Sequence, residues 1–187
     1  MAFVLGDSPI HPLTADEVMR MLDAGIIPKD NRFELLHGML TEKAVKGPDH
    51  CELKSRLAEW LWNPGSHRVR IEGVIRVADD TSLPEPDIAV VERADHLHEH
   101  PYGALLVAEV AKTSLKTDTQ IKPPLYAEAG IPECWVVDIK AGRVRVFRDP
   151  TPDGYATYTT HGPTGTLQPL EVDVEPLDLA ALFDGLR

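Results

Sequence analysis

The sequence predicts an α/β domain in which a β-sheet is flanked by helices. Runs of apolar and β-branched residues, such as 87–91 and 104–111, have the length and composition of buried strands. They alternate with segments in which leucines recur at helical spacing, and glycines or prolines separate these elements. The chain has 187 residues with 43% apolar content, which suits one domain with a substantial core.

A helix and a hairpin are predicted near the N-terminus. Thr14 and Glu17 have the spacing of a capping box, which predicts that a helix begins there, and Gly25 suits its left-handed end. The next segment, 32–40, predicts two short strands around a turn at 37–38.

A second helix and an extended segment follow. The helix is predicted to begin at 48–49, because three leucines then recur at helical spacing until the breaker sequence 63–65. Residues 67–78 predict extended chain with a bend or bulge at Gly73.

The C-terminal half combines one helical region with a hairpin. The prolines at 123–124 predict that the helical region ending at Gly130 either begins near residue 122 or is bent there. Residues 134–148 predict a β-hairpin. The segment 151–170 is rich in Pro, Gly and Thr, and 177–186 predicts a short closing helix.

The charge balance weighs against tight, sequence-independent binding of nucleic acid. The chain has 30 acidic and 19 basic residues and a net charge of -11, whereas nucleic-acid binders usually present a basic face. Arg68, Arg70 and Arg76 alternate so as to form a local basic strip on a strand face, as do Arg143 and Arg145. The alternative for both strips is a solvated, charged sheet face.

The sequence shows no targeting or disulfide pattern. No segment near the N-terminus resembles a signal peptide, and no run approaches the roughly 20 apolar residues of a membrane span, so we expect a cytoplasmic protein. Cys51 and Cys134 are far apart and lack a CxxC pattern, which predicts two buried thiols rather than a disulfide or a zinc site.

Two carboxylates followed by lysines give the main indication of function. Asp87 follows Pro86 at the start of one predicted strand, and Glu109 lies near the end of the next. Mg²⁺ is usually held by one or two carboxylates together with waters and substrate phosphate, so this order suits metal-dependent phosphodiester hydrolysis. A nearby lysine would stabilise charge that develops on the phosphate.

Side-chain alternation bears on which lysine acts. Lys112 is one step out of phase with Glu109 along the strand, so it points to the other face unless a bulge re-aims it. We therefore expect the lysine to come from the following segment, as Lys122 or Lys116. Lys122 also lies at a predicted helix N-terminus, which favours a bound phosphate.

Each of these residues also has a structural explanation. Asp87 could begin a strand from a turn, Glu34 could pair with Arg32, and His50 could be a packed helical histidine. Glu109 is harder to explain this way, because a carboxylate within an apolar strand needs a metal, a cation or a functional role to offset its desolvation. Three alternating histidines could line up as metal ligands, but nothing nearby completes a zinc shell, which favours a surface loop; they are His96, His98 and His100.

Five segments occur in a distinctive order: RFELLHGML, GPDHCELKSRL, PEPDIAVV, LLVAEVAKTSL and YAEAGIPECWVVDIKAGRVRVFRDP. In this order the chain resembles a bacterial family of restriction-endonuclease-like proteins, the Uma-two family endonucleases of the PD-(D/E)XK nuclease superfamily, from about residue 13 to the C-terminus. The resemblance implies a single restriction-endonuclease-like domain over 1–187, with a mixed, bent β-sheet flanked by helices. Its parts would be the N-terminal helices and hairpin at 13–62, the nuclease core at 68–148 and a C-terminal extension at 151–187.

The resemblance also implies roles for individual residues. Asp87, Glu109 and the carbonyl of Val110 would be the ligands of Mg²⁺ or Mn²⁺. The further catalytic positions would be Glu34 as the early acidic residue, His50 to orient a water or phosphate, and Lys122 as the catalytic lysine.

Three further residues lie close to this set in the sequence, namely Asp118, Tyr126 and Lys112. Asp118 and Tyr126 flank Lys122 at helical spacing and match the family pattern as supporting or packing residues. Lys112 departs from that pattern, and a cation there could bind phosphate or pair with a site carboxylate.

We therefore expect a Mg²⁺- or Mn²⁺-dependent endonuclease that hydrolyses DNA, and a homo-oligomer, such as a homodimer with two symmetric sites. The alternatives are a non-catalytic binding or assembly module that retains the nuclease fold, and a nuclease that acts on RNA. We expect no membrane association.

Overall fold

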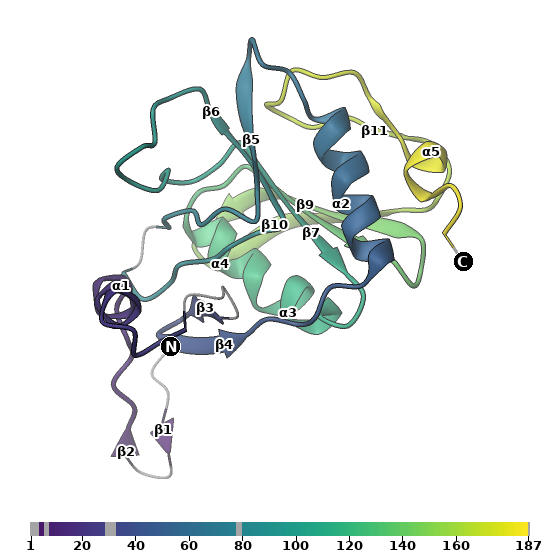
Figure 1. Ribbon diagram of the computed structural model, residues 1–187. Coiled ribbons are helices and arrows are strands. Elements are labelled where there is room, and N and C mark those ends of the chain that lie inside the picture. Colours follow the sequence, from purple (N-terminus) through teal and green to yellow (C-terminus); the bar gives the residue numbers. More distant parts are fainter. Residues whose placement is uncertain (1–3, 6–7, 29–32, 78–79, 187) are drawn as a thin grey trace.

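A six-stranded mixed β-sheet forms the centre of the protein, as a computed structural model of the chain shows (Figure 1). The structure describes residues 4–5, 8–28, 33–77 and 80–186. The sheet has the order β10-β9-β8-β7-β6-β5, and only β7 and β8 run parallel. Its strands are β5 (His67–Ile71), β6 (Ile88–Glu92), β7 (Leu106–Ala111), β8 (Glu133–Asp138), β9 (Arg143–Thr151) and β10 (Gly154–His161).

Strand β7 is buried on both faces, which explains its nearly continuous apolar sequence. Leu106, Ala108 and Val110 pack into the larger core, which includes leucines of helix α2 (Pro48–Trp60) and of helix α5 (Leu179–Phe183). Alternate residues of β7 face the second core, around Tyr126. Glu109 therefore lies on the Tyr126 side of the sheet, because side chains alternate along the strand.

The predicted helices are present, and local sequence signals explain their ends. Helix α1 (Ala15–Asp23) begins at the capping box of Thr14 and Glu17, as predicted. Helix α3 (Leu115–Gln120) ends just before helix α4 (Lys122–Glu128), whose first turn contains both prolines. The prediction that a helix begins near residue 122 is confirmed, because proline fits the first turn of a helix and not its interior.

The small sheets include the predicted N-terminal hairpin. Strands β3 (Phe33–Leu36) and β4 (Met39–Glu42) pair antiparallel around His37 and Gly38, which have φ angles of 49° and 77°. A Cβ at Gly38 would lie 2.3 Å from Cβ of Pro12, so this turn needs glycine for space as well as for backbone conformation. The other pairs are β1 (Val4–Leu5) with β2 (Ser8–Pro9), and β11 (Thr166–Leu167) with β12 (Leu177–Asp178).

Two findings differ from the sequence predictions. Strand β10 lies at a sheet edge in the segment noted only for its Pro, Gly and Thr content, and most of its residues are exposed. Without a buried face it lacks the apolar period that identifies a strand, so its pairing with β9 defines it. Cys51 is exposed, which makes the prediction of a buried thiol wrong for this residue, because it lies on the outward face of α2; Cys134 is buried.

None of the helices in the described part of the chain combines the length and the apolarity needed to cross a bilayer.

Candidate active site

A cleft of about 1060 Å³ brings together five predicted site residues from five separate parts of the chain. It lies between the β3–β4 hairpin, the start of α2, the adjacent ends of β6 and β7, and helices α3 and α4. The residues are Glu34, His50, Asp87, Glu109 and Lys122. All five are buried, and they contribute three acidic side chains, one lysine and one histidine to the lining of the cleft.

Asp87 immediately precedes β6 and is held by three donors. Its Oδ2 accepts a hydrogen bond from the Val110 N–H at 2.8 Å and lies 3.1 Å from Nε2 of His50, while its Oδ1 accepts from Nζ of Lys46 at 2.8 Å. Burial opposes ionisation of Asp87, but the interactions with His50 and Lys46 outweigh it and hold its pKa well below the usual range. Asp87 is therefore a fixed negative charge.

The backbone N–H and C=O of Val110 point toward the edge of β7 at which Asp87 lies. Strand β6 pairs with β7 only as far as the Ile88–Ala108 pair, so the next position on that edge of β7 is not covered by a strand. In an extended strand the N–H and C=O of one residue point to the same side, and the Val110 N–H points to Asp87. The carbonyl of Val110 therefore faces the edge where Asp87 lies.

Glu109 is almost completely buried and accepts two hydrogen bonds. Its Oε1 lies 3.0 Å from Nζ of Lys122 and 2.6 Å from the hydroxyl of Tyr126. Burial raises the pKa of Glu109 to about 8; Lys122 opposes this shift, and the nearby carboxylates Asp118 and Asp87 add to it. Burial thus favours the protonated form of Glu109, whereas Lys122 and any further positive charge in the cleft favour the ionised form.

Lys122 begins α4 and lies among the acidic residues. Its Nζ is 3.0 Å from Oε1 of Glu34, 3.0 Å from Oε1 of Glu109 and 3.9 Å from Oδ1 of Asp118. Burial would lower its pKa, but these carboxylates outweigh burial and raise it, so the ammonium group stays charged. The structure brings Lys122 to Glu109, whereas Lys116 is exposed and does not line the cleft.

Glu34 and Asp118 complete the surroundings of Lys122. Oε1 of Glu34 also accepts a hydrogen bond from the Glu85 N–H at 2.7 Å, which fixes its carboxylate. Its alternative partner, Arg32, lies outside the described residues. Burial raises the pKa of Asp118 to about 6, although Lys122 and a hydrogen bond from the Ser114 hydroxyl act against this shift.

Lys112 does not pair with a candidate ligand. It lines the cleft but is exposed, and its ammonium group forms an ion pair with Asp49 in the first turn of α2. The sequence left two roles open for Lys112, which were to bind phosphate or to pair with a site carboxylate. The structure does not contain the second, because Lys112 pairs with Asp49 and not with Asp87 or Glu109.

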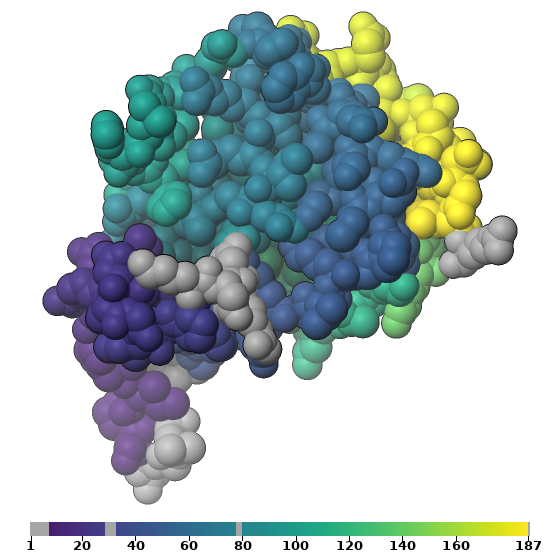
Figure 2. Space-filling view, in the orientation of Figure 1, coloured from purple at the N-terminus to yellow at the C-terminus, as the bar shows by residue number. Residues whose placement is uncertain are grey.

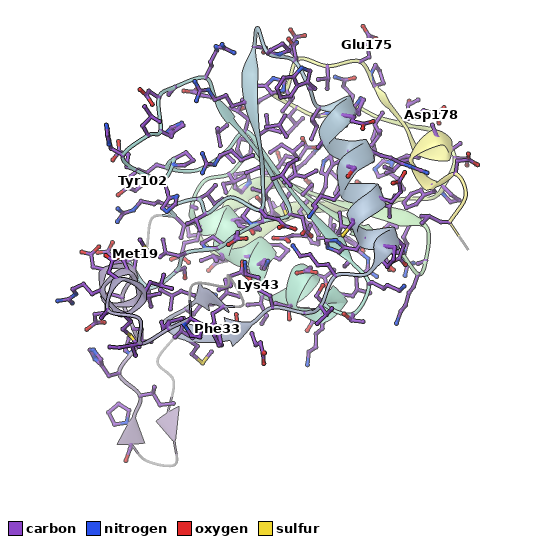
Figure 3. The ribbon with its side chains drawn as sticks, in the orientation of Figure 1. Met19, Phe33, Lys43, Tyr102, Glu175 and Asp178 are labelled. Atoms are coloured by element: carbon purple, nitrogen blue, oxygen red, sulfur yellow. The ribbon has the colours of Figure 1, made fainter. Side chains whose placement is uncertain are left out.

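Sequence reasoning missed two lysines at the cleft. Lys46 bridges Asp87 and Glu72, at 2.8 Å and 2.7 Å. Lys43, which is labelled in Figure 3, lies 2.8 Å from Glu85. Both come from the irregular segment between β4 and α2, where neither periodicity nor a motif marks them. Their partners lie more than 25 residues away along the chain, so only the fold reveals their roles.

One further sequence alternative is not supported. Within the described ranges, no three His, Cys, Asp or Glu side chains form a group that could hold a metal ion. The three alternating histidines, His96, His98 and His100, lie in the loop between β6 and β7, as the surface-loop interpretation predicts.

Comparison with known proteins identifies the family. The model of the Uma2 family, described as "Putative restriction endonuclease", matches residues 15–180. The chain belongs to the Uma2 family. This match confirms the resemblance seen in the sequence motifs, and it covers every residue of the cleft discussed above.

The fold of this Uma2 protein also occurs in a solved structure. That structure is titled as a crystal structure of "a putative nuclease belonging to DUF820" from Anabaena variabilis, with a TM-score of 0.77 and 17% sequence identity. The alignment covers 94% of this chain and 100% of the other. At this identity the likeness shows a shared fold, which confirms the predicted nuclease-like α/β architecture. No curated protein matches the chain.

Proposed function

We propose that this Uma2 protein is a metal-dependent endonuclease that hydrolyses phosphodiester bonds of DNA. The observation that carries the proposal is the convergence of Asp87, Glu109 and Lys122 in one cleft, from the adjacent ends of two paired strands and the start of a helix. Family membership supports a nuclease, and the cleft supplies the residues on which such chemistry would depend.

The donor set fits a hard divalent cation. Asp87, Glu109 and the Val110 carbonyl offer oxygen atoms only, and Mg²⁺ or Mn²⁺ prefers oxygen ligands. Two carboxylates and one carbonyl leave room for waters and substrate phosphate, as Mg²⁺ sites usually do. When bound, the cation would act as a Lewis acid toward phosphate and lower the pKa of a water molecule.

The residues of the chain have distinct roles in this proposal. Asp87 supplies permanent negative charge, because His50, Lys46 and the Val110 N–H hold it ionised. Lys122 would place a buried positive charge beside the phosphate, where the exclusion of water strengthens its effect on developing negative charge. Tyr126 orients Glu109 through its hydrogen bond of 2.6 Å.

Four lysines of this acidic chain line the cleft and offer positive charge to a phosphate-bearing substrate. Lys43, Lys46 and Lys112 line the same cleft as Lys122. Seven acidic residues line the cleft as well, so a bound divalent cation would add the positive charge that a phosphate needs there.

The alternative of a non-catalytic module rests on a specific observation. Asp87 is paired with Lys46, and Glu109 is paired with Lys122, so both candidate ligands are balanced by lysines of the chain itself. If these ion pairs persist in solution, the cleft needs no metal ion.

The deciding experiment is calorimetric titration of Mn²⁺, with and without a short DNA duplex, followed by a cleavage assay. The wild-type protein should bind Mn²⁺ saturably and cut DNA, and Glu109→Gln should lose both while remaining folded. The matched control is Glu59→Gln, an exposed residue near the end of α2 that does not line the cleft. Absence of both binding and cleavage in the wild-type protein, even with DNA present, would favour the module. Competition between DNA and RNA of the same sequence would identify the nucleic acid.

A further inference from the structure

A second cavity, separate from the cleft, carries two arginines. It has a volume of about 390 Å³ and lies between the start of α1, strand β5 and the loop that connects β6 to β7. Arg70 of β5 and Arg76 line it together with His100 of the loop. Helix α1 and the loop lie on the same face of the molecule (Figure 2).

Among the residues that the structure describes, neither of these arginines has a carboxylate partner. Other arginines of the sheet are neutralised: Arg143 and Arg145 pair with Asp138 at 3.3 Å and 3.2 Å. Within the described part of the chain, Arg70 and Arg76 form no ion pair, and Nε of Arg70 is buried without a hydrogen-bond partner. A buried donor without a partner is costly, which indicates that this group is built for a ligand.

Both arginine side chains are held in place by their surroundings. The guanidinium carbon of Arg76 lies 5.1 Å from the ring centre of Tyr102, which is labelled in Figure 3. The backbone of Arg76 is also fixed, because its main-chain N–H donates to the carbonyl of Pro101 at 2.8 Å. The Arg70 side chain lies over Gly73, where an added Cβ would be 3.0 Å from Nε. Positioned arginines lose less side-chain entropy when they bind a ligand, because their conformations are already restricted.

The other charged groups of the cavity do not cancel these arginines. Asp16 and Glu99 also line it, but both are exposed, so solvent and salt screen their charges. Burial lowers the pKa of His100, and Arg70 and Arg76 lower it further, although Glu85 acts in the opposite direction. His100 is therefore a neutral neighbour that can donate or accept a hydrogen bond.

We propose that this cavity is an anion site in which Arg70 and Arg76 bind a phosphate group. Guanidinium groups suit phosphate because their planar N–H donors match its oxygens in pairs. The three arginines that the sequence predicted to form one basic strip, Arg68, Arg70 and Arg76, therefore do not share one role. Arg70 and Arg76 reach the cavity, whereas the exposed Arg68 does not line it.

One segment of the chain contributes to both the cavity and the cleft. Leu83 lines the cavity, and Glu85 and Asp87 line the cleft. A phosphate in the cavity therefore has two possible sources: the backbone of a nucleic acid that also enters the cleft, or a free phosphate or nucleotide. The first source rests on the proposed function, whereas phosphate binding itself does not.

The test begins with inorganic phosphate titrated into the metal-free protein at constant ionic strength, followed by calorimetry or ³¹P NMR. Arg70→Gln and Arg76→Gln should each weaken phosphate binding about tenfold or more, as expected for the loss of a charged hydrogen-bond donor. Arg68→Gln, on the same strand and with the same change of charge, should bind like wild type. Glu99→Gln should change phosphate binding little, because solvent and salt screen this exposed carboxylate.

A second arm uses a short DNA duplex in EDTA, so that binding is measured without cleavage. If the phosphate belongs to nucleic acid, Arg70→Gln should weaken DNA binding and reduce the slope of log affinity against log salt by about 0.9, while Arg68→Gln changes both less. If the variants lose phosphate binding but keep DNA affinity, the site stands and its ligand is a free phosphate.

The proposal is overturned if wild type binds no phosphate, or if Arg70→Gln and Arg76→Gln bind it as Arg68→Gln does. Circular dichroism of each variant confirms that it is folded, and Arg76→Lys gives a second variant that keeps the charge but loses the paired donors. Neither arm depends on metal or on cleavage, so failure of this site and failure of the proposed nuclease activity remain distinguishable.

Discussion

Lys122 and Glu109 form a buried ion pair, with Nζ 3.0 Å from Oε1, between the first residue of helix α4 and the central strand β7. Both side chains are almost fully shielded from solvent. The same ammonium group also contacts Glu34, so one lysine balances acidic residues from two different strands. Removal of either partner would leave an uncompensated charge in a low-dielectric region.

The first prediction concerns this lysine. Lys122→Met should lower the free energy of unfolding by about 3–5 kcal/mol, because it leaves Glu34 and Glu109 buried next to each other without a cation. Urea unfolding at pH 8 measures the change. Lys116→Met, at an exposed position of α3, serves as the control and should shift stability by no more than about 0.5 kcal/mol. Equal effects of the two substitutions would refute the assignment.

The second prediction concerns the pH dependence of stability. The pKa of Glu109 is raised from 4.5 to about 8 in the folded protein, so the native state keeps a proton that the unfolded state has lost. Its contribution to stability is fully present below pH 4.5 and is lost as pH rises through 8, with a slope of up to about 1.4 kcal/mol per pH unit.

Glu109→Gln should remove this slope. The comparison is made between pH 6 and 8, because Asp118, whose pKa is about 6, contributes mainly below that interval. Urea unfolding of both proteins at fixed ionic strength gives the two curves. Parallel curves for wild type and variant would show that Glu109 does not titrate in this range.

The third prediction concerns proton release on metal binding. A carboxyl group must lose its proton to act as a ligand, so Mn²⁺ bound to Glu109 at pH 7 should release about one proton, and the affinity should increase as pH rises toward 8. Calorimetry in two buffers with different ionisation enthalpies measures the released protons. Asp87 should release none, because its pKa lies far below this range. Binding without proton release would show that Glu109 either is not a ligand or is already ionised beside Lys122, and Glu109→Gln separates the two cases because it keeps binding only in the first.

The fourth prediction concerns the turn that carries Glu34 into the cleft. Gly38→Ala places a Cβ 2.3 Å from Pro12 at a residue with a φ of +77°, so it should lower the melting temperature and displace the β3–β4 hairpin. Gly130→Ala is the matched control, because its φ is +72° but no atom lies within 4 Å of the new Cβ. The control should cost about 1–2 kcal/mol for backbone conformation alone. A comparable loss in the two variants would show that Pro12 yields to the added atom.

Much of the fold was predictable because its signals are local. The capping box of Thr14 and Glu17 and the hairpin turn at His37 and Gly38 occur where short-range rules place them. Strand β7 was predictable from its apolar run, within which Glu109 stood out as a residue that needs a partner. Strand β10 was missed, because an exposed edge strand carries no apolar period and is defined by its pairing with β9.

The candidate site also has one part that was predictable from the sequence and another that depends on the tertiary structure. The sequence by itself determined the two strand-end carboxylates and, through side-chain phase and family resemblance, a lysine from the segment after β7. Only the tertiary structure decided that Lys46 binds Asp87 across 41 positions, that Lys112 pairs with Asp49 instead, and that Arg70 and Arg76 face a common cavity. Backbone conformation and side-chain phase depend on neighbours along the chain, whereas the pairing of charges depends on which distant segments the packed sheet and helices bring within a few ångströms.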